Sequence, residues 1–403
     1  MAGKVPTTIE AVDQFFDALI KSRFIEMFGT PTQNEKHWPT EKMKEVAPAI
    51  HSDDLPKSEG NWLLNLDAIQ SDSGEILFKN RVPEAELNGS IITFSSNHVL
   101  YSKLRPYLNK VVVPDESGFG TTELIPLLPN KEKLTRTYLA YLLRSDVFVS
   151  KFSSAVAGTK MPRVSMDVFW RFDVPLPSMN LQKEFESFVK QVDKSKMLMK
   201  KCFEKYDQLV KSRFIEMFGT HHSCYFPMAN ISELVETNII KVSKKYRSED
   251  EISYIDISSI DKDSRSVCTF SVFLVSDAPS RAQQCVESGD ILMSTVRPNL
   301  CNIAIYDKNY ENPVCSSGLC VLRPSKCVKE YLLYCVLDDD YTYELVKLAT
   351  GSNYPAVTSK IILNTAVPNP PIELQKEFAN FVKQIDKSKF ALMESVMKVL
   401  NKA

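Results

Sequence analysis

The sequence predicts an α+β protein in which two mixed α/β bodies are joined by two long antiparallel coiled-coil helices, arranged as an internal pseudo-two-fold repeat. Two exact or near-exact repeats predict it. The ten residues KSRFIEMFGT occur at Lys21–Thr30 and again, unchanged, at Lys211–Thr220. The segment at Leu181–Lys196 returns at Leu374–Lys389 with few changes. Because the two offsets are nearly equal, the chain consists of two copies of one unit.

Between these segments the likeness is fainter but keeps its order, so each unit also has a divergent body. The matched pairs are Val99–Val113 with Ile291–Ile305, Thr121–Pro129 with Ser316–Pro324, Gly158–Ser165 with Gly351–Thr358, and Val174–Pro177 with Val367–Pro370. We place the first body at residues 31–178 and the second at residues 220–371.

Each body is predicted to mix strands and helices, because runs rich in β-branched residues are bounded by Pro or Gly. The expected strands are Ile91–Phe94, Val99–Leu104, Lys110–Val113 and Glu123–Leu128, then Ile252–Ser258, Ile291–Val296, Asn302–Tyr306 and Leu319–Leu322. One helix is expected at about Leu134–Ser153 and its counterpart near Val328–Leu348. A further strand leads into Val174.

The tails that follow the bodies are predicted to be long helices, at residues 179–219 and 372–403. Apolar residues alternate at three and four positions in the first tail, as in a coiled-coil seam. They are Phe185, Phe188, Val192, Met199, Cys202, Tyr206 and Leu209. Pro175 and Pro177 precede the helix, and Gly219 ends it.

The N-terminus supplies a piece that the second tail lacks. With an offset of 193, Ala403 stands opposite Val210, so the chain ends before a third KSRFIEMFG. That segment stands at Lys21–Gly29 instead, after an amphipathic lead-in. We therefore expect the N-terminal helix, within residues 1–30, to dock beside the C-terminal helix and complete a second tail.

Composition places the protein among globular chains. Apolar residues make up 44% and charged residues 25%, the balance of a folded domain. No run of 18 apolar residues occurs, and MAGKVPTTIE has no signal-peptide core, so we expect a cytoplasmic protein. The nine cysteines are expected to be packed thiols. Neither the spacing from Cys315 to Cys335 nor His221, His222 and Cys224 predicts a metal site.

The layout as a whole resembles the specificity subunit of type I restriction–modification systems (HsdS). Two variable bodies alternate with nearly identical helices, and S-x-x-R-P and G-T/S-x-x-x-P motifs occur in each body. The resemblance implies that each body is a target-recognition domain for half of a bipartite, asymmetric DNA site. It implies that the helices set the spacer and hold two modification subunits. Those partners carry S-adenosylmethionine and methylate adenine at N6, and restriction (motor–nuclease) subunits use ATP.

Charge constrains how such a chain binds DNA. The net charge is −1, with 27 basic and 27 acidic residues at positions 1–210 and 22 against 23 at positions 211–403. A stand-alone DNA-binding protein usually has a basic excess. Either the basic residues gather on one face, or partner subunits supply much of the phosphate contact.

Two other functions were considered. In the first, the chain is itself a DNA adenine methyltransferase or restriction enzyme. Asn369-Pro370-Pro371-Ile372 resembles an N-P-P-aromatic motif but lacks the aromatic ring, and Gly118-Phe119-Gly120 is no S-adenosylmethionine loop. Pro114-Asp115-Glu116 has no E-x-K partner, and no P-loop occurs. In the second, the chain is a structural coiled-coil adaptor. This function explains the helical tails but gives no role to the two bodies. We expect no catalytic residue and no cofactor on this chain.

The candidate DNA-binding residues fall into two groups. Matched positions are expected to bind phosphate or to be structural, and unmatched polar positions are expected to read bases. The matched candidates are Arg105, Arg297, Lys160 and Tyr354, and the unmatched ones are Lys79, Asn80, Arg81, Arg163, Lys244, Lys245, Arg247 and Arg281. A third set is expected to pack the helix end against a body or a partner subunit: Arg23, Phe24, Met27, Phe28, Arg213, Phe214, Met217 and Phe218.

Overall fold

The structure is a computed structural model, and it describes residues 9–53, 60–83, 87, 90–154, 156–157, 161–262, 264–351 and 354–400. The chain forms two compact units. The first unit is Asp13–Lys196, and the second is Met197–Lys402 together with Met1–Val12. No helix in the described part of the chain is both long and apolar enough to cross a membrane.

The first unit holds two main sheets. A four-stranded sheet has the order β3-β2-β7-β4, and a three-stranded sheet has the order β6-β5-β8. Their strands are β2 (Asn61–Leu64), β3 (Asn80–Val82), β4 (Ile91–Phe94), β5 (Val99–Ser102), β6 (Val111–Val112), β7 (Gly118–Thr121) and β8 (Leu124–Leu127). Between the sheets lies an apolar core that includes Trp62, Phe94 and Leu100.

Helices and short strands complete the first unit. They are α1 (Ile9–Phe28), α2 (Met43–Val46), α3 (Arg136–Arg144), α4 (Asp146–Ser154), α5 (Met166–Trp170), β1 (Thr40–Lys42), β9 (Val156–Ala157), β10 (Arg163–Val164) and β11 (Asp173–Pro175). Strand β1 pairs with β11, and β9 pairs with β10. The first pair joins the segment that follows α1 to the segment that leads into α6, and the second pair lies beside Leu104.

The second unit repeats this plan with larger sheets. A six-stranded sheet has the order β13-β22-β19-β20-β16-β15, and a four-stranded sheet has the order β17-β14-β21-β18. The strands are β12 (Met228–Asn230), β13 (Val235–Glu236), β14 (Glu251–Ile255), β15 (Ile260–Asp261), β16 (Ser266–Val267), β17 (Ser271–Leu274), β18 (Ala282–Cys285), β19 (Ile291–Ser294), β20 (Ile303–Ile305), β21 (Pro313–Ser316), β22 (Leu319–Pro324) and β23 (Ala366–Pro368). The short helices are α7 (Ile231–Leu234), α8 (Val242–Lys245), α9 (Lys329–Val336), α10 (Asp339–Lys347) and α11 (Ser359–Asn364).

The helix expected in each body is in fact two helices. In the first body Ser145 separates α3 from α4 in an extended conformation, and its hydroxyl accepts the backbone N–H of Phe148. In the second body the Asp338 side chain accepts the N–H groups of Asp340 and Tyr341 at the start of α10. Ser and Asp cap helices because their side chains bind N–H groups that have no helical partner. The prediction of single helices was therefore wrong.

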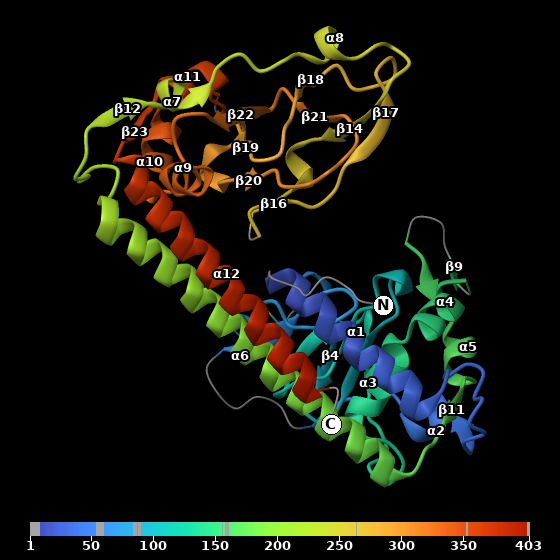
Figure 1. Ribbon diagram of the computed structural model, residues 1–403. Helices are drawn as coiled ribbons and strands as arrows, with labels where there is room; N and C mark the ends of the chain where they lie inside the picture. The colour runs from blue at the N-terminus through green and yellow to red at the C-terminus, as the bar shows by residue number, and fades with distance from the viewer. Residues whose placement is uncertain are drawn as a thin grey trace. The chain divides into compact units, whose positions relative to one another are not determined.

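The two tails are α6 (Met179–Phe218) and α12 (Ile372–Leu400). Within the second unit, α12 runs antiparallel to the second half of α6 (Figure 1), since Arg213 pairs with Glu377 and Lys389 with Asp207. The φ angle of Gly219 is +82°, and its N–H donates to the carbonyl of Ile215. A Cβ there would lie 2.2 Å from the carbonyl oxygen of Ser223. Glycine therefore ends α6, as predicted.

The N-terminal repeat segment lies in α1, and its docking beside the C-terminal helix stays a prediction. The contacts of α1 within the first unit are with the first half of α6, where Lys196 pairs with Asp13 and Asp17. The same arrangement occurs in both units: α1 stands to α6 in the first unit as α6 stands to α12 in the second. Each unit thus begins and ends with a helix of its own antiparallel pair.

Where these helices meet the body, each unit has the same cluster of aromatic rings. The first aromatic cluster is Phe24, Phe28, Tyr138 and Phe185, and the second is Phe214, Phe218, Tyr331 and Phe378. The Phe24–Tyr138 centroids are 5.6 Å apart and those of Phe214–Tyr331 5.8 Å. All eight rings are buried. Such pairs contribute about 0.5–1.5 kcal/mol each beyond their buried area, so the clusters fix helices to bodies.

All nine cysteines are free thiols, and five of them are buried. In the described residues, no group of three or more His, Cys, Asp or Glu side chains is placed to hold a metal ion.

Candidate nucleic-acid interface

Two equivalent turns carry the matched arginines of the S-x-x-R-P motifs. Arg105 and Arg297 adopt the left-handed conformation, with φ of 49° and 50°, and each precedes a one-turn 3₁₀ helix, Pro106–Leu108 or Pro298–Leu300. This conformation costs a residue with a side chain about 1–2 kcal/mol. Both arginines are exposed. Strained backbone that holds an exposed cation outward, in the same geometry twice, is typical of a functional turn.

A second loop is fastened to each turn. The N–H of Arg105 donates to the carbonyl of Pro162 at 2.8 Å, and that of Arg297 donates to the carbonyl of Pro355 at 2.7 Å. The motif serines, Ser102 and Ser294, are buried, and their hydroxyls donate to backbone carbonyls two residues later. They therefore shape the turn and do not face solvent. We call these two places the first and second turn sites.

The first turn site contains an ion pair that reduces its positive charge. Arg163 donates to both carboxylate oxygens of Glu123, with the shortest contact at 2.6 Å. This hydrogen-bonded pair lowers the pKa of Glu123. Arg163, expected to read bases, is thus held by a carboxylate. Lys160, the expected loop tip, lies outside the described residues.

The second turn site is built differently. Its counterparts of Glu123 and Arg163 are Gly318 and Ala356. The Arg297 guanidinium lies 4.6 Å from the centroid of the Tyr354 ring, and Tyr354 is 70% exposed. This pair offers a cation and a flat ring at the surface, the two features that bind phosphate and stack on bases.

Arg281 belongs to the same end of the second body. Its backbone carbonyl accepts the N–H of Ser317, next to the second turn site. An open hollow lies beside it, lined by Tyr254, Asp256, Ile257, Ser258, Ile260, Arg281, Asn302 and Ser316. The structure therefore brings the backbone of Arg281 close to the second turn site.

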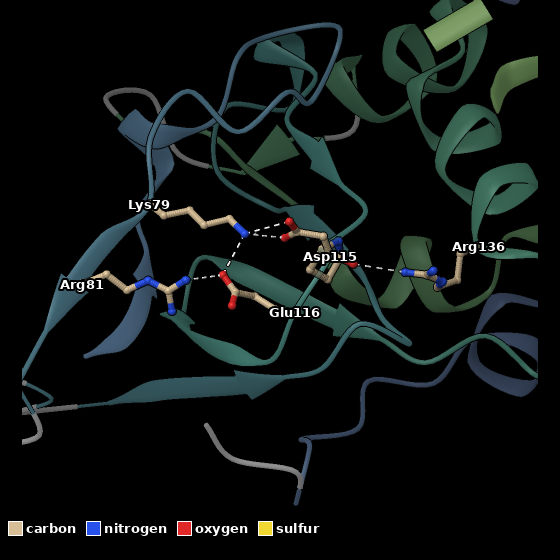
Figure 2. Close-up of polar contacts among 6 residues, drawn as sticks. Lys79, Arg81, Asp115, Glu116 and Arg136 are labelled. Carbon is tan, nitrogen blue, oxygen red and sulfur yellow. Dashed lines mark hydrogen bonds and ion pairs between the residues drawn. The ribbon is translucent and has the colours of Figure 1, made fainter. Parts of the chain in front are cut away.

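Lys79 and Arg81 lie against carboxylates. Figure 2 shows Lys79 between Asp115 and Glu116, with its shortest contacts at 2.7 Å, and Arg81 at 2.5 Å from Glu116. Burial opposes the charged form of Lys79, but the bonds to Asp115 and Glu116 outweigh it and raise the pKa of Lys79. Two cations face two anions, so the group is neutral as a whole.

Neighbouring residues position this charged group. The Arg136 guanidinium donates to the carbonyl of Pro114 at 3.1 Å and so fixes the acidic turn (Figure 2). Lys79 also lies 4.8 Å from the ring of the buried Trp62. Asn80 is exposed beside them on β3. The chain bends at Asp115 and Glu116, and their carboxylates bind cations of the same body.

Lys244, Lys245 and Arg247 lie apart from the second turn site. Lys241 precedes α8 and forms an antiparallel β-bridge with Gln284, near the end of β18. Arg281 precedes the start of the same strand. All three cations are exposed, and Lys245 lies 5.3 Å from the Tyr246 ring. Within the described part of the chain, no ion pair involves these three side chains. The structure thus divides the second body's candidates between two ends of one sheet.

The repeated residues of the helix ends lie in the scaffold. Phe24, Phe28, Phe214 and Phe218 form the aromatic clusters, Met27 is buried and Met217 is half-buried. Arg213 binds Glu216 and Glu377, each at 3.0 Å, and Arg23 lies near their counterparts Glu26 and Glu184.

The sequence analysis missed four buried polar residues that connect bodies to helices: Gln182, Gln375, Tyr138 and Tyr331. Gln182 and Gln375 stand in the repeated segment LQKEF, so the repeat itself marked them. They were overlooked because polar residues in a helical pattern usually face water. Asn369-Pro370-Pro371-Ile372 serves as helix start: the Pro371 carbonyl accepts the N–H of Leu374, and that of Pro370 accepts the Gln375 amide.

Comparison with known proteins gives consistent results. A family model described as the type I restriction modification DNA specificity domain matches residues 24–205 and again residues 226–402. The specificity subunit of the type I restriction enzyme MjaVIII from Methanocaldococcus jannaschii is 25% identical over 293 residues, 67% of this chain and 68% of that protein. The EcoDI specificity subunit from Escherichia coli is 26% identical over 99 residues, 25% of this chain and 22% of that protein.

A solved structure also resembles the chain. It belongs to a study of complex assembly and conformational transition of the type I R-M system. The match has a TM-score of 0.54 at 19% identity and covers 91% of this chain and 94% of that one. At this identity the likeness shows a common fold.

Proposed function

The chain belongs to the type I restriction–modification DNA specificity family, and from this premise we propose that its two bodies read the two different halves of one split DNA site. As a specificity subunit it recognises DNA and is not the catalytic subunit of its system. The modification subunits would carry S-adenosylmethionine and methylate adenine at N6, and ATP-dependent restriction subunits would cut. The chain would act in the cytoplasm.

The proposal rests on one observation: the aromatic clusters that hold each body on its helices have the same geometry in both units, whereas the turn sites differ. We call the helices and aromatic clusters the frame. Equivalent ring distances in the two aromatic clusters agree closely, for example 4.8 Å for both Phe28–Tyr138 and Phe218–Tyr331. The turn sites on this frame differ, because one carries Arg163 with Glu123 and the other carries Tyr354. A common frame with different reading surfaces suits an asymmetric, two-part target.

The candidate residues then take two roles. The exposed Arg105 and Arg297, matched in geometry, would bind phosphate and set the register of each body on DNA. The unmatched polar residues would read bases. They are Lys79, Asn80, Arg81, Arg163, Lys244, Lys245, Arg247 and Arg281. Lys160 and Tyr354, at the tips of the matched loops, would also contact DNA. Because the chain has a net charge of −1, partner subunits would supply part of the phosphate contact.

The helix ends would also dock the partners. Ile25 and Ile215 stand at equivalent positions and are 42% and 45% exposed. Each follows an arginine that pairs with a glutamate, Arg23 with Glu26 or Arg213 with Glu216. Two equal surfaces suit two copies of one modification subunit.

Helix α6 would act as the ruler between the half-sites. Its 40 residues give a length of about 60 Å. This length corresponds to about 18 base pairs at 3.4 Å each, an upper limit for the separation.

Modification-sensitive long-read sequencing tests the proposal. The chain is expressed with and without its modification subunit, and the cellular DNA is sequenced for N6-methyladenine. We expect a split, asymmetric motif only when both are present. Methylation by this chain alone would make it a methyltransferase. A verified complex that leaves DNA unmethylated, and does not bind it, would favour a structural adaptor.

A further inference from the structure

Each body is connected to its helix by a buried glutamine. The Gln182 side chain is fully buried. Its oxygen accepts the N–H of Thr135, and its amide nitrogen donates to the carbonyls of Lys133 and Pro177, all at 2.9 Å. Lys133 and Thr135 belong to the body, just before α3, whereas Pro177 precedes α6. One side chain therefore ties the body to the helix that leaves it.

The second unit repeats this connection. Gln375 is 1% exposed. Its oxygen accepts the N–H of Val328, the residue before α9, and its nitrogen donates to the carbonyl of Pro370, both at 2.9 Å. A buried amide is costly unless its groups are bonded. Finding it twice, with equivalent partners, indicates that the bonds themselves have a role.

A tyrosine on the body's own helix adds a parallel bond. The Tyr138 hydroxyl donates to the carbonyl of Pro175 at 2.9 Å, and the Tyr331 hydroxyl donates to that of Pro368 at 2.7 Å. Both hydroxyls bind the first proline of the V-P-x-P linker, and the glutamines bind the second. The linker has two prolines with fixed φ, and its carbonyls are held on both sides. We name these arrangements the first joint (Tyr138, Gln182) and the second joint (Tyr331, Gln375).

The bonds and the aromatic clusters constrain different motions. Apolar contact is non-directional, so stacked rings hold body and helix together but allow sliding and rotation. Hydrogen bonds weaken steeply away from straight geometry. In each joint the tyrosine hydroxyl and the glutamine nitrogen donate, and the glutamine oxygen accepts. Because these bonds connect the body to the linker and the helix, they fix the angle between the body and its helix.

We propose that the two joints are positioning elements that make recognition strict in spacer length. This inference rests on the proposed function. A body that reads half of a split site can accept a spacer one base pair too long or too short only by swinging on its helix. The joints oppose this swing, so rejection of wrong spacers depends on them as well as on the length of α6.

The test uses the full chain assembled with its modification subunits. The variants are Tyr138→Phe/Gln182→Met and Tyr331→Phe/Gln375→Met, which keep side-chain volume and remove the bonds. The matched control is Tyr341→Phe. It also removes a buried hydroxyl bond, to Thr365 at 2.9 Å, but this bond lies within the body. A library holds both half-sites at the native spacer and at one base pair more or less, and methylation is read by sequencing.

We expect the joint variants to lose about 10-fold or more of the preference for the native spacer, as loss of two or more net hydrogen bonds implies. Their half-site sequences stay unchanged, and Tyr341→Phe stays strict. If a double variant does not fold, Tyr331→Phe or Tyr138→Phe alone serves with the same readout. Joint variants with the spacer preference of the wild type would overturn the inference. A wild-type complex that methylates no split motif contradicts the proposed function itself and removes the basis of the inference.

Discussion

At the scale of single residues, the two bodies differ in the charged side chains beside their turn sites. Glu123 and Arg163 form a pair in the first body, and Gly318 and Ala356 replace both partners in the second. Loss of only one partner would leave a partly buried charge without its counter-ion, which is unfavourable. The two positions therefore act as one electrostatic element, and its presence or absence changes the surface beside Arg105 or Arg297.

We expect Arg163→Ala to lower the melting temperature of the chain by about 2 °C, because Glu123 is then left without its partner. The double variant Glu123→Ala/Arg163→Ala recovers most of this loss. Thermal unfolding of the wild type, both single variants and the double variant gives the coupling between the residues. If the changes in melting temperature of the two single variants simply add up in the double variant, Arg163 and Glu123 do not stabilise each other. Arg163 would then serve only to bind DNA.

His98 predicts a pH dependence of folding. Its ring is 2% exposed, Nδ1 accepts the N–H of Ser95, and Nε2 lies 2.9 Å from the carbonyl of Ile50. Burial lowers the pKa of His98, although the bonds to Ile50 and Ser95 oppose this shift. The lowered pKa favours the neutral form of the His98 ring in the folded state, in which Nδ1 accepts from Ser95.

The sign follows from linkage. Below about pH 6.5 the unfolded chain binds a proton at His98 and the folded chain does not, so the free energy of unfolding falls as pH drops, by up to about 1.4 kcal/mol per pH unit. The fall ends once pH passes below the folded-state pKa. Melting temperatures of His98→Gln should change less between pH 7 and 5 than those of the wild type. His37→Asn, at an exposed position, is the control. If the melting temperature of His98→Gln changes with pH as much as that of the wild type, His98 is not the cause of the pH dependence.

At the scale of elements, the repeat and the hydrophobic pattern predicted the long helices and the central strands of both bodies. The C-terminal end of α6 was also predictable, because only a residue without a Cβ fits at Gly219. The short strands β2, β3, β7 and β17 were not, because they depend on pairing between distant segments. The partners of polar side chains could not be predicted either. The pattern of the helix places Gln182 at its surface, and only the structure shows the backbone groups that it binds. In the same way, only the structure shows that Lys79 lies against Asp115 and Glu116.

Insertion of one heptad after Lys200 tests the role of α6 as a ruler. Seven residues lengthen the helix by about 10 Å and nearly preserve its face, so the spacer should grow by roughly 3 base pairs. Methylation sequencing of the reconstituted complex measures it. A four-residue insertion, which rotates the face by about 40°, is the control and should reduce activity. An active heptad variant with an unchanged spacer would show that α6 is no ruler.

At the scale of the whole molecule, each unit is complete in itself. It holds its own antiparallel helix pair, aromatic cluster and joint, and the segments KSRFIEMFGT and LQKEF that contribute to them are the same in both units. Under the proposed function, such an organisation would separate the choice of half-site from the assembly of the complex. It also explains why nearly neutral charge is compatible with the function, since DNA need not be held by this chain alone.

Replacement of Gln33–Ser178 by the first body of another family member should change one half of the methylated motif and leave the other half as it was. The physical reason is that the first aromatic cluster and Gln182 would accept the new body if it keeps a tyrosine equivalent to Tyr138. Sequencing of methylated DNA from cells with the exchanged chain provides the measurement. A change in both halves would contradict the assignment of one half-site to each body.

The identity of the segments around the bodies also has a consequence for inheritance. KSRFIEMFGT and LQKEF flank both bodies, so the gene carries similar stretches at corresponding places. A crossover between them would move a complete body from one position to the other, or bring one in from a related gene, without damage to either joint. A lineage with such a gene can acquire a new DNA target in one recombination event, whereas point mutations must rebuild a reading surface one residue at a time.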